Sequence, residues 1–404
     1  MQLNYLALAV PLFLAFMGLE YVIARKTGKN YFSFTHSVTS INTGIAERLL
    51  DTFTVGIFYF VYDYLYHHFA IWHIQPSILL WIALLLCTDF IWYWYHRLAH
   101  EVNVLWCAHV VHHQSEDFNY TVSARITVFQ AFARTGFWAV LPILGFPPAM
   151  ITSVLLVHGL YPFFIHTRTI GKLGILEYVL VTPSHHRVHH ASNPQYLDRN
   201  YGDVLIVWDK LFGTFAVEEE EPVYGLTKPL DSNSFLWQHF HFILELMYAV
   251  RRERGWKQKL KLVFGKPDYI DPEIRNILEQ KYLLRNSTVP AVRRLNDYVI
   301  WQVAVTLLVL FAFLLLEYYV PAMVQVCITL LILLTLVNIG AILEQRKWVF
   351  YLEYSRIILL FIAVFYWWPS PALLFIATLA QLVAFFFRTN IKQHYLRLVY
   401  GAAS

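Results

Sequence analysis

Histidines are concentrated in two short segments of this 404-residue chain, which hold nine of its 18 histidines. Residues 96–113 contain the patterns His-x3-His and His-x2-His-His, and residues 185–190 read His-His-Arg-Val-His-His. Spacings of three and four residues place side chains on one face of a helix. Eight histidines therefore form one pair and two triplets, each aimed in a common direction: His96 and His100; His109, His112 and His113; His186, His189 and His190.

These patterns predict a metal centre, because neutral imidazole is the most common side-chain metal ligand. One ion takes roughly three to six ligands, so eight imidazoles suit two ions. Imidazole binds zinc, copper, iron and nickel. A closed zinc site usually includes cysteine, whereas Cys87, Cys107 and Cys327 are scattered and predicted to be small buried residues. The residue types alone favour iron only slightly over the other metals.

The elements that carry these histidines are predicted to be membrane helices. The chain is 58% hydrophobic and only 14% charged, whereas a soluble domain carries about a quarter charged residues. Runs of about 20 apolar residues are long enough to span a bilayer. The sequence therefore predicts an all-α polytopic membrane protein with about nine membrane segments, some of them half-spans: residues 3–23, 50–71, 77–95, 126–145, 148–166, 298–320, 322–343, 349–368 and 371–388.

Basic residues predict the orientation of these segments. Arg25, Lys26 and Lys29 follow the first run directly, and the basic groups after later runs fall on the same side as the histidines. Because basic loops stay in the cytoplasm, we expect a histidine-rich helical cap on the cytoplasmic face. The net charge of +4 is weak and does not favour nucleic-acid binding.

Four regions are expected along the chain. They are membrane segments in residues 1–84, a histidine-rich catalytic region in 85–230, a cytoplasmic basic segment in 231–297 and membrane helices in 298–404. The loops are short, and residues 400–404 do not spell an endoplasmic-reticulum retrieval signal. These features favour a bacterial inner membrane, with the endoplasmic reticulum as the alternative.

The residues around the histidines resemble a known family. The stretches at 89–103, 113–119, 164–167, 182–190 and 200–215, which include Asp-Phe-Ile-Trp-Tyr-Trp-Tyr-His-Arg-Leu-Ala-His and Thr-Pro-Ser-His-His-Arg-Val-His-His, carry this resemblance. They are similar to the fatty acid hydroxylase/sterol desaturase superfamily of membrane di-iron oxygenases, and most similar to its alkylglycerol monooxygenase branch. The resemblance covers about residues 85–230, and the remainder matches only in hydropathy.

The resemblance implies a metal-ligand set and a reaction. The ligands of two iron ions would be His96, His100, His109, His112, His113, His166, His186, His189 and His190. The enzyme would use O2 to hydroxylate a C–H bond of a bilayer lipid. In the alkylglycerol branch an ether lipid is cleaved to an aldehyde and a glycerol derivative, with tetrahydrobiopterin as reductant. No glycine-rich nucleotide motif follows a strand, so electrons would come from such a small donor or from a redox partner.

Further residues near the histidines are predicted to support the ligands, because a ligating imidazole usually donates its other N–H to a carboxylate or carbonyl. Asp89 lies seven residues before His96, on the same helix face and within an apolar run. An unpartnered carboxylate is costly at that depth; an ion pair with Arg97 is the alternative. Similar candidates are Glu116, Asp117, Asn119, Asn200, Asp203 and Asp209. Of these, Glu116, Asn119 and Asp209 are predicted with Asp89 to be catalytic residues. Whether His158 or His185 is a ligand stays open.

Alternative functions share some of these features. A sterol desaturase or a lipid acyl-chain hydroxylase would use the same iron chemistry, so the histidines do not distinguish them. A metal transporter is a more remote alternative, because its ligands should lie near the middle of the membrane in broken helices. Here the histidines cluster at the predicted cytoplasmic ends.

Overall fold

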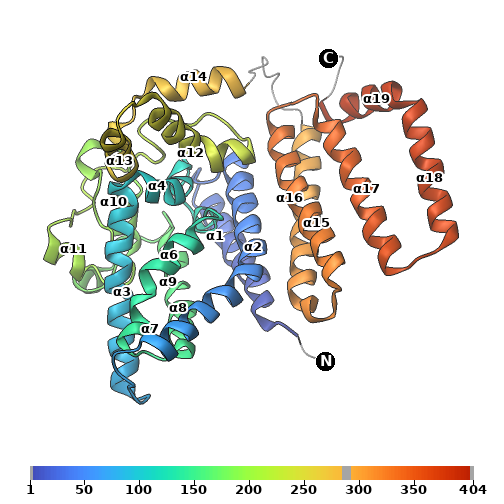
Figure 1. Cartoon of the computed structure of the whole chain (residues 1–404). Helices are drawn as coiled ribbons and strands as arrows, with labels where there is room; N and C mark the ends of the chain where they lie inside the picture. Colours follow the sequence, from blue (N-terminus) through green and yellow to red (C-terminus); the bar gives the residue numbers. More distant parts are fainter. Residues whose placement is uncertain (1–2, 284–292, 401–404) are drawn as a thin grey trace. The chain divides into compact units, whose positions relative to one another are not determined.

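The computed structural model describes residues 3–283 and 293–400 (Figure 1). Within them the regular structure is helical, and extended pairing is limited to the isolated bridges Leu180–Leu205 and Ala191–Tyr224. The predicted all-α class is confirmed. Two compact units are present: a C-terminal unit (Met1–Ala15, Ser232–Trp237 and Leu284–Ser404) and a histidine unit (Phe16–Asp231 and Gln238–Leu283). The four predicted functional regions stay a prediction.

Among the described residues, six helices are long and apolar enough to cross a membrane: Tyr5–Lys26, Ile78–Glu101, Pro148–Ile165, Leu295–Tyr319, Ala322–Leu343 and Val349–Trp367. The helices Pro371–Phe386 and Arg388–Tyr400 make a seventh candidate if they count as one span bent by 86°. The chain is an integral membrane protein, as predicted.

Two of the predicted segments take a different form, and the total of nine stays a prediction. Residues 50–71 largely belong to the 36-residue helix α2 (Phe34–Phe69), where Asp51 and Asp63 interrupt the apolar run. Residues 126–145 are divided between the short helices α6 (Gln130–Trp138) and α7 (Val140–Leu144).

Helix α3 (Ile78–Glu101) organises the histidine unit. It begins where the Ser77 hydroxyl accepts a hydrogen bond from the backbone N–H of Leu80, at 3.2 Å, a usual way to start a helix. Its far end carries His96 and His100, and the short helix α4 (Asn103–His109) packs beside it (Figure 1).

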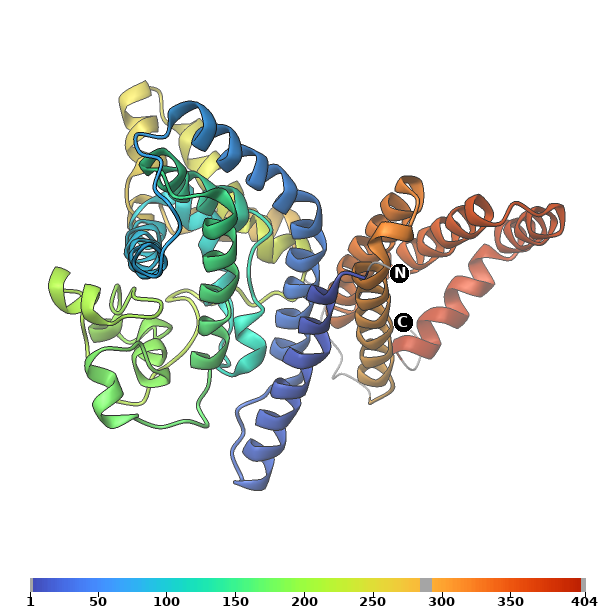
Figure 2. The same ribbon diagram turned by 90° about the horizontal axis from the view of Figure 1, so that it is seen from below.

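The other helices of the histidine unit are mostly short. In the view along α3, the segments of residues 167–230 gather on one side of it (Figure 2). The remaining elements are α1 (Ala9–Lys26), which begins in the other unit, η2 (Val110–Gln114), α5 (Tyr120–Ser123), α8 (Pro148–His158), α9 (Tyr161–Ile165), η3 (Gly174–Tyr178), α10 (Pro183–His189), η4 (Pro194–Tyr196), α11 (Val207–Phe212), α12 (Phe235–Arg252), α13 (Trp256–Phe264), η5 (Pro267–Tyr269) and α14 (Glu273–Tyr282).

The C-terminal unit is a set of apolar helices joined by one polar cluster. Its elements are η1 (Tyr5–Leu8), α15 (Arg293–Leu316), η6 (Glu317–Tyr319), α16 (Ala322–Leu343), α17 (Val349–Trp367), α18 (Pro371–Phe386) and α19 (Arg388–Tyr400). The Glu353 carboxylate on α17 accepts hydrogen bonds from Tyr298 at 2.6 Å, Gln302 at 2.7 Å, Asn338 at 2.7 Å and Tyr395 at 3.2 Å. Four helices therefore share one carboxylate, which would be costly among apolar helices without these donors.

Candidate metal centre

The nine predicted ligands come together as two groups. The five-histidine group consists of His96, His100, His109, His113 and His189, and the four-histidine group of His112, His166, His186 and His190. In each group, one ring nitrogen from every member lies within 4.8 Å of the others. The side chains are buried except for His100, which is partly exposed. The structure thus divides the predicted ligands between two positions.

The spacing of the histidines explains the division. Residues four apart stay in one group, as with His109 and His113, whereas His112 between them belongs to the other. On α10, His186 and the cap residue His190 likewise belong to the four-histidine group, while His189 joins the five-histidine group. Each of these two short segments therefore contributes to both positions.

A contact between His112 and His166 indicates that a cation belongs between them. The Nδ1 atom of His112 donates to the carbonyl of Arg125 at 3.2 Å, and that of His166 to the carbonyl of Pro162 at 2.5 Å. A neutral imidazole that donates from Nδ1 has a lone pair on Nε2. The two Nε2 atoms nevertheless face each other at 3.1 Å. Two lone pairs cannot hydrogen-bond to each other, so this contact fits two ligands of one ion.

The five-histidine group likewise brings ring nitrogens close together. His96 donates from Nδ1 to the carbonyl of Tyr201 at 2.8 Å, and its Nε2 lies 3.0 Å from Nε2 of His109. Nitrogens about 2.1 Å from a shared ion are about 3 Å apart when they subtend a right angle. The Nε2 atoms of His100 and His189 are buried without a hydrogen-bond partner among the described residues. The residues present therefore fit a metal ion at each position.

Burial keeps these imidazoles neutral. It lowers the pKa of His166 to about 4. Burial, followed by the repulsion of neighbouring imidazoles, also holds the pKa values of His112, His186 and His190 well below the usual value. Because metal ions compete with protons for the ring lone pair, a site with low pKa values is ready to bind metal at neutral pH.

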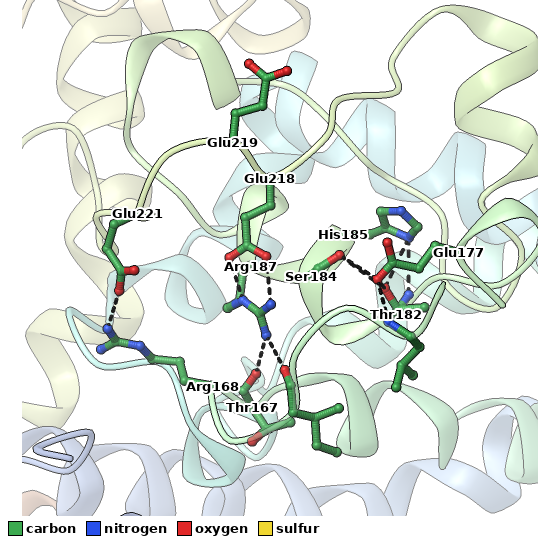
Figure 3. A network of polar contacts seen from close by, with 12 residues as sticks. Thr167, Arg168, Glu177, Thr182, Ser184, His185, Arg187, Glu218, Glu219 and Glu221 are labelled. Carbon is green, nitrogen blue, oxygen red and sulfur yellow. Dashed lines mark hydrogen bonds and ion pairs between the residues drawn. The ribbon is translucent and has the colours of Figure 1, made fainter. Parts of the chain in front are cut away.

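Arg187 ties helix α10 to the segment that carries His166 (Figure 3). Its guanidinium bonds both carboxylate oxygens of Glu218 at 2.7 Å and donates to the carbonyls of Thr167 at 3.0 Å and Ile170 at 2.8 Å. Such bidentate pairs are geometrically specific. Since Thr167 follows His166 directly, this contact holds two parts of the four-histidine group in register.

Asp89 and His158 form a separate buried cluster with Asp203. The two ring nitrogens of His158 lie 3.0 Å from the Asp89 carboxylate on one side and 3.0 Å from the Asp203 carboxylate on the other. Asp89 also accepts from the backbone of Val204 at 3.0 Å and from the Trp208 indole at 2.8 Å. Both nitrogens of His158 therefore face carboxylates, outside both histidine groups. The expected role of Asp89 beside the ligands stays a prediction.

The other predicted residues lie around the centre in different ways. Asn119 donates to the carbonyl of Tyr31 at 2.7 Å, and its oxygen caps α5. Glu116 is exposed. His185 belongs to neither group, and its ring accepts from the backbone at the start of α10. Asp209 is fully buried against the backbone of residues 201 and 202. Catalytic roles for Glu116, Asn119 and Asp209 stay predictions.

A partly open cleft of about 380 Å³ reaches the histidines. His100, His113, His189 and His190 form part of its wall, together with the rings of Trp106 and Phe242. Charged residues of both signs also line it: Glu101, Asp198, Lys228, Glu245, Lys266, Asp268, Asp271 and Arg275. The cleft offers polar molecules a route to the metal positions, and sequence patterns gave no sign of it.

Comparisons with known proteins agree with this site. Residues 81–214 match the family described as fatty acid hydroxylase. An alkylglycerol monooxygenase from Homo sapiens is 35% identical over 356 residues, which cover 85% of this chain and 78% of the relative. The Danio rerio protein of the same name is 32% identical over 386 residues, covering 92% and 84%. The Xenopus tropicalis protein is 35% identical over 269 residues, covering 66% and 60%.

No solved structure matches the chain. The predicted resemblance is nevertheless confirmed, and the curated relatives extend it beyond residues 85–230 to most of the chain. The chain belongs to the alkylglycerol monooxygenase family, with a histidine-rich region of the fatty acid hydroxylase type, and is a membrane monooxygenase.

Proposed function

We propose that the protein is a di-iron monooxygenase that cleaves ether lipids of the alkylglycerol type. The observation that carries the proposal is the contact of His112 and His166, whose Nε2 lone pairs face each other at 3.1 Å within one of two buried histidine groups. The names of the relatives support the substrate class. Ligands that are all neutral imidazoles would leave the two iron ions with their full positive charge and strongly oxidising, which suits the oxidation of an inert C–H bond.

The proposed reaction consumes one O2, two electrons and two protons. One oxygen atom enters the C–H bond beside the ether oxygen, and the other leaves as water. The resulting hemiacetal breaks its C–O bond to glycerol, and its hydroxyl proton passes to the glycerol oxygen. A fatty aldehyde and a glycerol derivative are released.

The protein's own residues would provide placement and protection. When bound, the two iron ions would supply the reduction of O2 and the oxidation of the C–H bond. The imidazoles, all buried except that of His100, would fix the two ions. Electrons come from tetrahydrobiopterin or an external donor, and the cleft beside Trp106 and Phe242 gives a small donor a route to His100 and His113.

The test is a product analysis with purified, ferrous-loaded protein in detergent. An alkylglycerol, 18O2 and a candidate reductant should yield a fatty aldehyde that carries the label after rapid reduction to the alcohol. The His112→Ala variant should yield none. A hydroxylated acyl chain or an unsaturated sterol from parallel substrates, without aldehyde from alkylglycerol, would support the sterol desaturase or acyl-chain hydroxylase alternative instead.

We further propose that the histidine groups face the cytoplasm and that the host membrane is a bacterial inner membrane, with the endoplasmic reticulum as alternative. The basic residues Arg25, Lys26 and Lys29 at the end of α1 support the orientation. The orientation is tested with a cysteine introduced beside Lys29. Its labelling by a membrane-impermeant thiol reagent is compared between intact and permeabilised cells. Labelling that needs no permeabilisation would overturn the orientation.

A further inference from the structure

Residues 198–201 contact three members of the five-histidine group. The carbonyl of Tyr201 accepts from His96 at 2.8 Å, and that of Arg199 accepts from Nδ1 of His189 at 2.9 Å. A carboxylate oxygen of Asp198 lies 3.8 Å from Nδ1 of His100. Two of the three contacts use backbone atoms. The positions of these imidazoles therefore depend on the backbone conformation of the 198–201 segment.

This backbone conformation is unusual and held by side chains. Asp198 and Asn200 have φ angles of 60° and 56°, in a left-handed region that non-glycine residues seldom adopt. The Asn200 side chain donates to the carbonyl of Ala216 at 2.8 Å and accepts from its N–H at 2.8 Å. It also donates to the carbonyl of His185 at 3.1 Å. Such strained residues persist where the surroundings fix them.

Asp209 fixes the end of the same segment. Its carboxylate accepts from the backbone N–H of Tyr201 at 2.7 Å and of Gly202 at 2.7 Å, and from the Thr214 hydroxyl at 2.7 Å. A side chain at position 202 would be 2.7 Å from the carbonyl of Leu205 and 2.9 Å from this carboxylate. The segment therefore packs so closely on Asp209 that a side chain at position 202 would not fit without a shift of the backbone.

The four-histidine group has further supports of its own. His112 and His166 donate to the carbonyls of Arg125 and Pro162. Arg187 bonds the residue that follows His166. These contacts involve none of residues 198–201. Asn200 does reach α10 at the carbonyl of His185, but the carbonyls of Arg199 and Tyr201 bond only members of the five-histidine group.

We infer that the 198–201 segment, fixed by Asp209 and Asn200, positions the ligands of the five-histidine group and sets the metal affinity of that group alone. Asp209 and Asn200 are then positioning residues that act through two backbone carbonyls. The inference rests on the proposed two-metal function.

Cobalt(II) titration of the metal-free protein in detergent, followed by its visible absorption, provides the test. In Asp209→Asn, an amide NH2 group replaces one of the two acceptor oxygens. A donor then faces a backbone N–H donor, and that hydrogen bond is lost. Loss of a group that supports a metal ligand lowers metal affinity roughly 10- to 100-fold. One of the two ions should therefore bind more weakly by that factor, while the other binds as in wild type.

Two backgrounds assign the weakened ion. With His186→Ala and His190→Ala the four-histidine group is disabled, and adding Asp209→Asn should weaken the remaining ion. With His96→Ala, His109→Ala and His113→Ala the five-histidine group is disabled, and adding Asp209→Asn should change nothing. An equal effect in both backgrounds, or in neither, would overturn the inference.

A second variant covers the case in which Asp209→Asn does not fold. Glycine adopts positive φ without strain, so Asn200→Gly keeps the backbone conformation accessible but removes the side-chain bonds. It should weaken the same ion. The matched control is Glu353→Gln, at a carboxylate of the C-terminal unit that accepts from Tyr298, Gln302 and Asn338. This variant should bind two ions as wild type does. Wild type that binds no ion would overturn the proposed function itself, whereas two ions unaffected by both variants would overturn only this inference.

Discussion

Arg187 holds Glu218 with two parallel hydrogen bonds of 2.7 Å, and its remaining nitrogen reaches the carbonyl of the residue after His166. The neighbouring pair of Arg168 and Glu221 has a single bond of 2.6 Å (Figure 3). The Glu218 side chain is 15% exposed and that of Glu221 is 78% exposed. The same kind of ion pair therefore occurs once in a buried and once in a solvated setting.

This difference in exposure predicts that a Glu→Gln substitution has a larger effect at position 218 than at position 221. Glu218→Gln should lower the stability of the protein by about 2 kcal/mol, because it weakens a charged hydrogen-bond pair away from water. It should also weaken the ion of the four-histidine group. Glu221→Gln is the matched control and should cost less than about 1 kcal/mol. Thermal unfolding and metal titration check both; equal effects of the two variants would contradict the assigned role of Arg187.

The division of the histidines predicts that two adjacent residues serve different ions. His112→Ala should weaken the ion of the four-histidine group, and His113→Ala that of the five-histidine group. Metal titration of each variant in the two disabled backgrounds distinguishes the positions. Both variants should lose monooxygenase activity. If both weaken the same ion, the two groups are wrongly divided.

The low pKa values predict the pH dependence of the metal-free protein. Burial lowers the pKa of His166 to about 4, so the unfolded chain takes up a proton near pH 6.5 that the folded protein accepts only near pH 4. Stability should be complete above about pH 6.5 and fall toward pH 4, by about 1.4 kcal/mol per pH unit for this residue. The lowered pKa values of His112, His186 and His190 should also decrease the stability as the pH falls.

Melting temperatures of chelator-treated protein between pH 8 and pH 5 measure this dependence. The His166→Gln variant is the control and should show a shallower decline, because glutamine does not titrate. A melting temperature that stays constant down to pH 5 would mean that the imidazoles are already protonated, or solvated, in the folded protein.

The polar cluster of the C-terminal unit predicts a purely structural effect. Glu353→Ala should leave Tyr298, Gln302 and Asn338 without their shared acceptor, at a cost of about 1–3 kcal/mol for each buried group left unpaired. Protease sensitivity of residues 293–400 should rise. The number of bound metal ions should stay at two, and a loss of metal would show that the cluster supports the other unit.

The histidines could be predicted from sequence because metal binding demands particular side chains at particular spacings. The assignment of His112 and His189 to groups different from their neighbours could not, since it depends on how α10 and the segment of residues 103–114 face each other. The carbonyls of Arg199 and Tyr201 carry no sequence signal at all, because every residue has a carbonyl.

Hydropathy was informative for helices that are apolar throughout and less so elsewhere. The runs that became α3 and α16 are long and contain few charges. The run at 126–145 includes Arg134, and it folds as two short helices. Asp89 was expected to support a metal ligand because it lies two helical turns before His96 in an apolar run. Its hydrogen-bond partners, His158, Trp208 and the backbone of Val204, carry no such sequence signal.

The seven-residue helix α10 together with its cap residue supplies His186 and His190 to one histidine group and His189 to the other. The division of these three side chains between the two groups is therefore tied to the pitch of a single helical turn. One residue inserted after Arg187 would rotate His189 and His190 by about 100° and turn both away from their ions at once. One turn of backbone thus sets the directions of three ligands, and because every residue of this turn is buried, it should tolerate no change in length.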